Sequence, residues 1–105
     1  MFTVTFVVNE KPGTDRGQAL AYWRDTHGPI VRKVPGVRRY VQQHALGAPE
    51  GGPPFLGVAS MYFDDQEAFA TAAASAEFAA AVADVANFAD PQLATAFTED
   101  VVIVG

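Results

Sequence analysis

Hydrophobic and polar positions alternate along residues 2–8 and divide this segment into two faces. One face carries Phe2, Val4, Phe6 and Val8, and the other carries Thr3, Thr5 and Val7. A period of two is typical of a β-strand with one buried face. Runs of β-branched and aromatic residues predict three further strands, within residues 35–46, 55–63 and 94–105.

The segment after the first turn has the period of a helix. Seven positions fall within an arc of about 120° at 100° per residue. They are Leu20, Trp23, Arg24, His27, Ile30, Val31 and Val34. Asp15, with Gln18 three residues later, predicts a capping box at the start. Pro29 lacks a backbone donor and disfavours helical geometry at Gly28, so we expect one helix to stop near His27 and a second short segment to begin at Pro29.

Residues 68–89 contain twelve alanines and predict two helical pieces that meet near Ser75. Asp64, with Glu67 three residues later, predicts the cap at the start of this region. The second piece has an apolar stripe made of Phe78, Val82, Val85 and Phe88. Residues 46–54 hold three glycines and three prolines, which predicts a hairpin loop between the second and third strands.

The order β-α-β-β-α-β predicts a single α+β domain over residues 1–105 with the ferredoxin-like fold. Right-handed crossovers place both helical regions on one face of a four-stranded antiparallel sheet. The third strand is largely apolar on both sides, and Val102 and Val104 lie opposite Val101 and Ile103 on the fourth. The face without helices therefore needs a cover, and we predict a homodimer packed sheet against sheet.

Composition narrows the possible partners. The chain has no cysteine and no apolar run near twenty residues, and its N-terminal segment reads as a strand rather than a signal peptide, so we expect a cytoplasmic protein without a membrane span. A net charge of −5 argues against nucleic-acid binding. All seven Lys and Arg residues nevertheless lie within residues 11–39. They form either a solvated basic helix or a local positive field for an anionic small molecule.

Several kinds of chemistry are disfavoured by the residues present. The chain has no phosphate-binding loop and no dinucleotide fingerprint, and Ser60 and Ser75 have no neighbouring histidine in sequence. His27 and His44 lie on different elements without the spacing of metal ligands. We therefore expect neither metal nor cofactor, which leaves general acid–base chemistry.

His27 is the leading candidate because the ordinary pKa of an imidazole is near neutrality. A position at a helix C-terminus favours the imidazolium. Arg24 one turn earlier, with the apolar Leu20 and Trp23, favours the neutral ring. The alternative is a core histidine that donates to a backbone carbonyl freed at the Gly-Pro break.

Tyr40 is the second candidate, and it shares a strand face with Gln42 and His44. Its hydroxyl could donate to an oxygen that gains charge, or the ring could simply fill the core. Arg24 could attract a carboxylate or phenolate. The large apolar side chains expected to shape a pocket, or else to be core, are Trp23, Phe6, Phe63 and Phe78. His44 is expected to be structural or superficial, and Asp25, about 200° around the helix from His27, cannot orient that ring within one subunit.

The sequence YWRDTHGPIVRKVPGVRRYVQ (residues 22–42) resembles the signature of EthD-like proteins, and residues 63–90 resemble their second half. The resemblance implies a dimeric α+β barrel. It places His27 on the histidine of the family motif and Tyr40 on the tyrosine after Pro-Gly, positions that line the pocket of isomerase-like relatives. Those relatives include a methylmuconolactone isomerase, polyketide cyclases and dehydratases, and a component of ether degradation. Isomerase-like members also use a cysteine, which this chain lacks.

Two functions follow from these expectations. The first is a cofactor-independent acid–base enzyme of the isomerase, cyclase, dehydratase or oxygenase type, acting on a small cyclic or aromatic metabolite. In it His27 would move a proton and Tyr40 would stabilise the oxygen that gains charge. The second is a non-catalytic binding or accessory protein that assists a partner oxygenase. A dimer with a vestigial pocket is the third possibility.

Overall fold

Four strands form one antiparallel sheet in the computed structural model, which describes all 105 residues. The strands are β1 (Phe2–Val8), β2 (Arg39–His44), β3 (Gly57–Phe63) and β4 (Ala94–Thr98). Their order in the sheet is β2-β3-β1-β4, and Val4 of β1 lies opposite Met61 of β3 and Phe97 of β4. This topology confirms the predicted ferredoxin-like α+β fold. Strand β2 pairs only with β3, so its outer edge is free.

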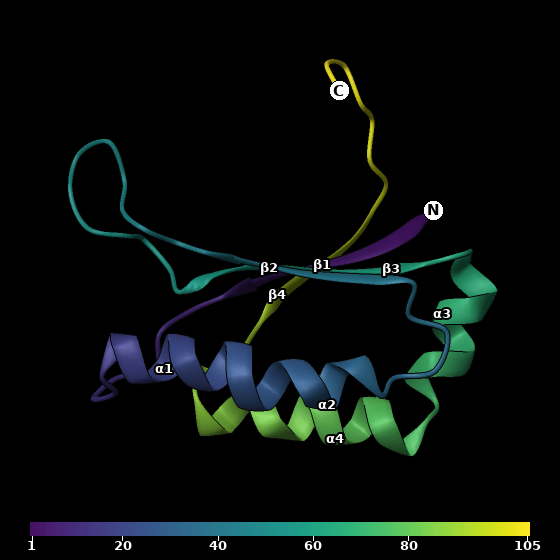
Figure 1. The fold of residues 1–105 in the computed structure, drawn as a ribbon, viewed down its shortest axis with the longest axis horizontal. Helices are drawn as coiled ribbons and strands as arrows, with labels where there is room; N and C mark the ends of the chain where they lie inside the picture. The colour runs from purple at the N-terminus through teal and green to yellow at the C-terminus, as the bar shows by residue number, and fades with distance from the viewer.

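The helices lie on one side of the sheet, as predicted (Figure 1). They are α1 (Arg16–Tyr22), η1 (Trp23–His27), α2 (Gly28–Arg32), α3 (Gln66–Ala73), α4 (Ala76–Asp84) and η2 (Val85–Asn87). Helices α1, α2 and α4 run beneath the sheet, and α3 stands at its end. No single helix is long and apolar enough to cross a membrane. Helix α3 and the segment Ala76–Asn87 satisfy length and composition only together, and they are bent by 76° at the break between them.

The helix caps follow the sequence closely. The Asp15 carboxylate accepts a hydrogen bond from the Gln18 backbone N–H at 2.9 Å, and Ser75 caps α4 where the two alanine-rich pieces meet. The prediction for α3 is wrong by one residue, because Asp65 rather than Asp64 accepts from the backbone of the first turn. Asp64 instead forms an ion pair with Arg38.

The expected break at Gly28-Pro29 does not occur. The backbone stays right-handed helical through His27 and Gly28, and residues 23–27 widen into a π-helix. Pro29 has no N–H to give to the preceding turn, and the Gly28 N–H donates to the carbonyl of Trp23, five residues earlier. His27 therefore lies inside a continuous helix, not at a C-terminus.

The core between sheet and helices consists of two clusters. One surrounds Trp23 and contains Val8, Ala19, Leu56, Ala59, Val85, Phe88 and Ala89. The other contains Val4, Val31, Val34, Met61, Phe63, Ala72 and Ala81. Phe6 and Tyr40 pack against both clusters. Phe6 of β1 and Tyr40 of β2 therefore lie between the two core clusters, and the site described below lies at this boundary.

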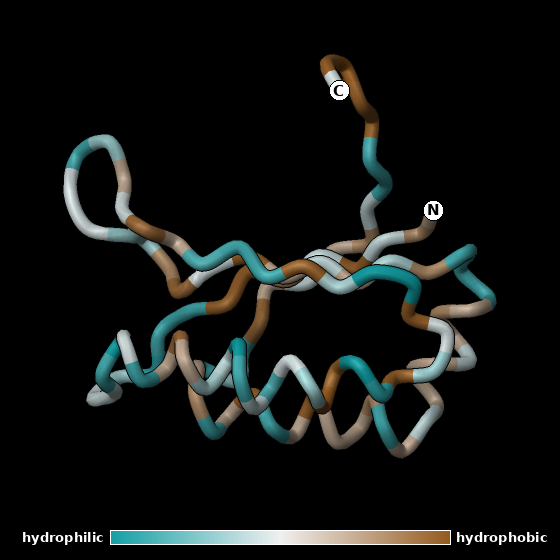
Figure 2. The backbone as a smooth tube through the Cα atoms, viewed as in Figure 1, coloured by the Kyte–Doolittle hydropathy of each residue, from teal (hydrophilic) through white to brown (hydrophobic).

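The C-terminal segment departs from its prediction. Strand β4 ends at Thr98, and residues 99–105 leave the sheet on the side away from the helices (Figure 1). Figure 2 shows this tail standing away from the rest of the chain, hydrophilic where it leaves the sheet and hydrophobic toward its end. Its side chains Val101, Val102, Ile103 and Val104 are 72–95% exposed. Strand β4 ends where its pairing with β1 ends, at Thr98 opposite Thr3. Within one chain the four apolar side chains beyond it have no surface against which to pack.

Candidate functional site

The π-helical turn brings Trp23 and His27 to the buried side of the first helical region. Their relative exposures are 1% and 6%. The carbonyl of Trp23 accepts the Gly28 N–H and also the side-chain amide of Gln42, whose Nε2 lies 2.8 Å away on β2. The wide turn is therefore tied directly to the edge strand of the sheet.

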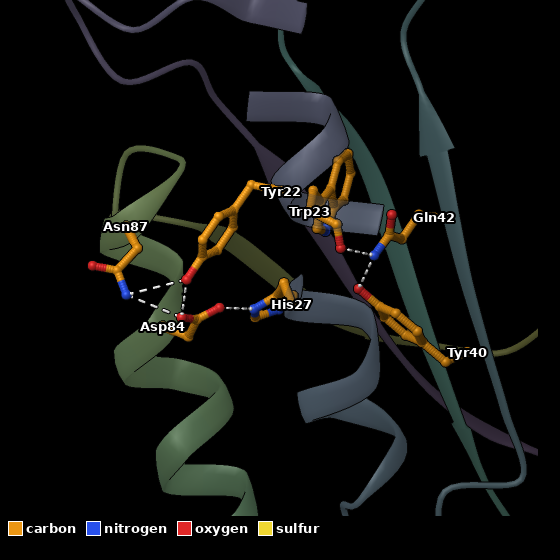
Figure 3. A network of polar contacts seen from close by, with 7 residues as sticks. All are labelled: Tyr22, Trp23, His27, Tyr40, Gln42, Asp84 and Asn87. Carbon is orange, nitrogen blue, oxygen red and sulfur yellow. Dashed lines mark hydrogen bonds and ion pairs between the residues drawn. The ribbon is translucent and has the colours of Figure 1, made fainter. Parts of the chain in front are cut away.

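His27 forms a buried pair with Asp84 of α4 (Figure 3). Its Nδ1 lies 2.9 Å from Asp84 Oδ2, and both side chains are less than 10% exposed. The other carboxylate oxygen, Oδ1, accepts from the Tyr22 hydroxyl at 2.6 Å and from Asn87 Nδ2 at 3.0 Å. Three donors, from α1, η1 and η2, thus converge on one carboxylate and hold it in place.

Hydrogen bonding and burial set the charge states of the pair. Burial would raise the pKa of Asp84, but the hydrogen bonds from Tyr22, Asn87 and His27 outweigh it and hold that pKa below its usual range. Burial lowers the pKa of His27, against the opposing effect of the Asp84 carboxylate. At neutral pH the carboxylate is charged and the imidazole neutral.

These charge states determine the tautomer of His27. An ionised carboxylate can only accept, so the proton of the neutral ring lies on Nδ1. Nε2 then carries the basic lone pair, and it makes no hydrogen bond within the chain. Asp84 was not among the residues expected from the sequence. The signal that could have identified it is its place beside the apolar stripe of residues 78–88, about 40° from Phe88 on a helical projection.

His27 lines an apolar cavity of about 50 Å³ between the sheet and the helices. Thirteen of its fourteen lining residues are hydrophobic, and His27 is the exception. The lining consists of Phe6, Val8, Trp23, His27, Val31, Tyr40, Ala59, Met61, Phe78, Ala81, Val82, Val85, Phe88 and Leu93. A benzene-sized ligand fills a cavity of roughly 150 Å³, so a ring enters only if lining side chains move. Val82, which is 57% exposed, lies where the lining meets the surface.

Most of the expected pocket residues meet at this cavity. Trp23, Phe6, Phe78 and Tyr40 line it together with His27. Phe63 does not: it is fully buried in the second core cluster, with its ring edge-on to Phe69 at 5.4 Å. Phe63 is therefore a core residue, because its strand position places it beneath α3, away from the π-helical turn.

Arg24 also lies outside the cavity. It is on the exposed side of the helix and forms an ion pair with Asp25 at 2.9 Å. It lines a separate, wider groove of about 770 Å³ between α2 and β2. Asp25 is thus engaged away from His27, in keeping with its expected direction on the helix.

Tyr40 stands between the cavity and this groove, since it is the one residue that lines both. Its hydroxyl accepts from Gln42 Nε2 at 3.1 Å, which leaves its own proton free to be donated. Burial raises the pKa of Tyr40, so the phenol keeps that proton at neutral pH. His44, expected to be structural, stacks on the Trp23 ring at 4.8 Å and bonds to the Gln42 side chain.

The chain contains no group of three His, Cys, Asp or Glu side chains arranged to hold a metal ion. The cavity-lining residues that carry polar side-chain atoms are His27, Tyr40 and Trp23. Together His27 and Tyr40 can exchange a proton with a bound molecule and donate a hydrogen bond to it.

These features define a class of small ferredoxin-like α+β domains with a buried histidine–carboxylate pair beside an apolar cavity. The family model of the EthD domain matches residues 11–92, so the chain belongs to the EthD family. It is 30% identical over 100 residues to an uncharacterized 11.0 kDa protein in the thcB-thcC intergenic region of Rhodococcus erythropolis, a match that covers 95% of each chain.

Solved structures share the fold. An EthD family protein from Bacillus halodurans C-125 is 29% identical with a TM-score of 0.81, covering 96% of this chain and all of that one. A dimeric ferredoxin-like protein of unknown function from Thermobifida fusca YX is 12% identical with a TM-score of 0.67, covering 92% of this chain and 88% of that one. At 12% identity the second likeness is one of fold.

Proposed function

We propose that this protein is a cofactor-independent acid–base enzyme that acts on a small cyclic or aromatic metabolite. The observation that carries the proposal is the buried pair of His27 Nδ1 and Asp84 Oδ2, with the imidazole on the wall of an apolar cavity. The two further donors to Asp84 fix its carboxylate, and the carboxylate in turn orients the imidazole of His27.

His27 acts through Nε2, where it takes a proton from an acidic C–H of the bound molecule. The imidazolium that forms is stabilised by the Asp84 carboxylate at Nδ1, and it then returns the proton to a second atom of the same molecule. Such a transfer changes no oxidation state and yields an isomer. Tyr40 donates its free proton in a hydrogen bond to the substrate oxygen that gains negative charge. The same groups also serve cyclisation, dehydration or the deprotonation that precedes an oxidation.

The class of ligand that we propose follows from the residues that line the cavity. Thirteen hydrophobic lining residues suit an apolar ring, and the rings of Phe6, Phe78 and Phe88 offer faces and edges to it. His27 is the one lining residue that can act as a base near neutral pH, which suits a substrate with one reacting position. The missing cysteine sets the chain apart from isomerase-like relatives, so the particular isomerisation they perform is not proposed.

The assembly we propose is a homodimer through the sheet face without helices. That face presents half-buried Val7, Val41 and Val58, and the apolar tail beyond Thr98 projects on the same side. A second copy would bury both surfaces. Sedimentation equilibrium at micromolar concentration tests this, and a mass of 11.2 kDa would overturn it. A cytoplasmic location remains the prediction made from the sequence.

The catalytic proposal is tested with a panel of lactones, phenols and anthrone-like compounds, followed for binding and for product. We expect turnover by the wild type and its loss in His27→Gln, with the melting temperature little changed. Lys33→Gln is the control, because Lys33 lines neither the cavity nor the groove between α2 and β2. Conversion by His27→Gln at the wild-type rate would overturn the proposal.

The second candidate, a binding or accessory protein, is favoured by the small and almost wholly apolar cavity. Binding of panel compounds by both the wild type and His27→Gln, with no product from either, would support it over the enzyme.

A further inference from the structure

Arginines dominate the groove that lies outside the cavity, between α2 and the free edge strand β2. Four of its ten lining residues are Arg24, Arg32, Arg38 and Arg39, and none is acidic. Its polar lining also includes the hydroxyl of Tyr40, the amide of Gln42 and the ring of His44. Such a surface is unusual in a chain whose net charge is −5.

Nearby carboxylates neutralise only part of this positive charge. Arg24 pairs with Asp25, and Arg38 pairs with Asp64, and neither aspartate lines the groove. Arg32 forms no ion pair, and its side chain makes no hydrogen bond within the chain.

The remaining arginine is not neutralised either. Arg39 lies over the ring of Tyr62 at 5.2 Å, a contact that leaves its charge in place. Tyr62 alternates with the core residues Met61 and Phe63, so its ring and the Arg39 guanidinium lie on the face of the sheet without helices. The groove therefore keeps one uncompensated guanidinium group, that of Arg32, beside the partly neutralised Arg24 and Arg38.

The positive field extends to the floor of the groove. Burial lowers the pKa of His44, and the charges of Arg24 and Arg16 lower it further. A concave surface lined by one sign of charge concentrates its field and attracts counter-ions. Guanidinium groups bind planar anions such as carboxylates through paired hydrogen bonds.

We propose that this groove binds the anionic group, a carboxylate or phenolate, of the molecule whose apolar part reaches the cavity. Tyr40 lies between the two spaces and contacts both. The inference deepens the proposed function by adding a negative charge to the substrate class. The inference depends on the proposed enzymatic function in one respect only: that the bound molecule is a substrate.

The test compares 1-naphthoate with uncharged 1-naphthalenemethanol, which have the same ring system. Each is titrated into ¹⁵N-labelled protein at low ionic strength, and the backbone amide shifts report site and affinity. We expect naphthoate to shift the amides of Gly28, Gln42 and His44. It should bind about tenfold more tightly than the alcohol and lose that advantage in high salt, because added ions screen exposed charges.

Two matched variants separate the groove from the general field of the basic segment. Arg32→Gln should weaken naphthoate binding about three- to tenfold, the effect of one charge-assisted contact. Lys33→Gln removes the same charge from the neighbouring residue, which does not line the groove, and should change the affinity less than about twofold. Neither change should affect the binding of the alcohol.

Three results would overturn the inference. They are equal affinities for the two compounds, naphthoate shifts confined to other surfaces, or equal losses in Arg32→Gln and Lys33→Gln. The outcome is independent of the catalytic proposal, because the preference for naphthoate over the alcohol, and its loss in Arg32→Gln, are measured by binding and require no product. If the protein converts no compound of the panel but binds naphthoate more tightly than the alcohol, the enzymatic proposal fails and the proposal of an anion-binding groove stands.

Discussion

Replacement of Asp84 by asparagine separates the two roles that this residue could have, holding the fold together and setting the state of His27. Oδ1 accepts from Tyr22 and Asn87, and Oδ2 accepts from His27. In Asp84→Asn the amide oxygen can take the place of Oδ1 and keep its two donors. The amide NH₂ then faces His27 Nδ1, which must accept rather than donate.

The neutral imidazole therefore changes tautomer, and its proton lies on Nε2 instead of Nδ1. The lone pair is then lost from the atom that should act as the base, although the geometry is preserved. We expect activity to fall by about 10²- to 10⁴-fold, the range of general acid–base catalysis. The free energy of unfolding should fall by about 1–3 kcal/mol, because three hydrogen bonds to a charged carboxylate become bonds to a neutral amide, while the amide costs less to bury than the carboxylate.

The change can be followed without a known substrate. Nitrogen chemical shifts of the His27 ring distinguish its tautomers, and a pH titration reports its pKa. We expect an Nδ1–H tautomer in the wild type, and in Asp84→Asn an Nε2–H tautomer with a still lower His27 pKa, since the carboxylate raises it. Tyr22→Phe is the control, because it removes a donor to Oδ1 and leaves the bond to Oδ2. A wild-type ring protonated at Nε2, or the same tautomer in both proteins, would refute the reasoning.

Two further predictions concern stability. The pKa of His27 is lowered in the folded chain, so the unfolded chain binds more protons as the pH falls below about 6.5, and the free energy of unfolding should decrease with acidification. The lowered pKa of Asp84 has the same effect nearer pH 4. Chemical denaturation at a series of pH values measures both contributions, and above pH 5 the free energy of unfolding of His27→Gln should vary less with pH than that of the wild type. Gly57→Ala should destabilise the fold by about 1–3 kcal/mol, since a Cβ there would lie 2.7 Å from the Trp23 ring. Gly52→Ala, with no atom within 4 Å of the added carbon, should unfold at the wild-type temperature, and equal losses in the two variants would contradict the packing argument.

Strands and caps were predicted well because their signals are local. The alternation in residues 2–8 reappears as β1, and Arg39–His44 and Gly57–Phe63 fall within the predicted strands. Asp15 caps its helix as expected, since a cap depends on backbone groups only three residues away, and the two alanine-rich pieces meet at Ser75 as predicted. The ferredoxin-like topology followed from the order of these elements.

The first helix was predicted only in part. Its buried face, with Trp23 and His27, is present, but the Gly-Pro pair widens the helix rather than ending it. Proline propensity favours a break when the segment is considered alone. Packing of both side chains under the sheet, and the bond from Gln42 to the Trp23 carbonyl, stabilise the continuous path.

The sequence by itself determined the elements, their order, and the placement of Trp23 and His27 on the buried face of the first helical region. Only the tertiary structure decided that Asp84 meets His27 across 57 positions of chain, that Phe63 is core, and that the last seven residues leave the sheet. Periodicity describes which face of an element is apolar. Which polar group on a neighbouring element lies opposite that face depends on how the helices cross, and a local pattern carries no information about that.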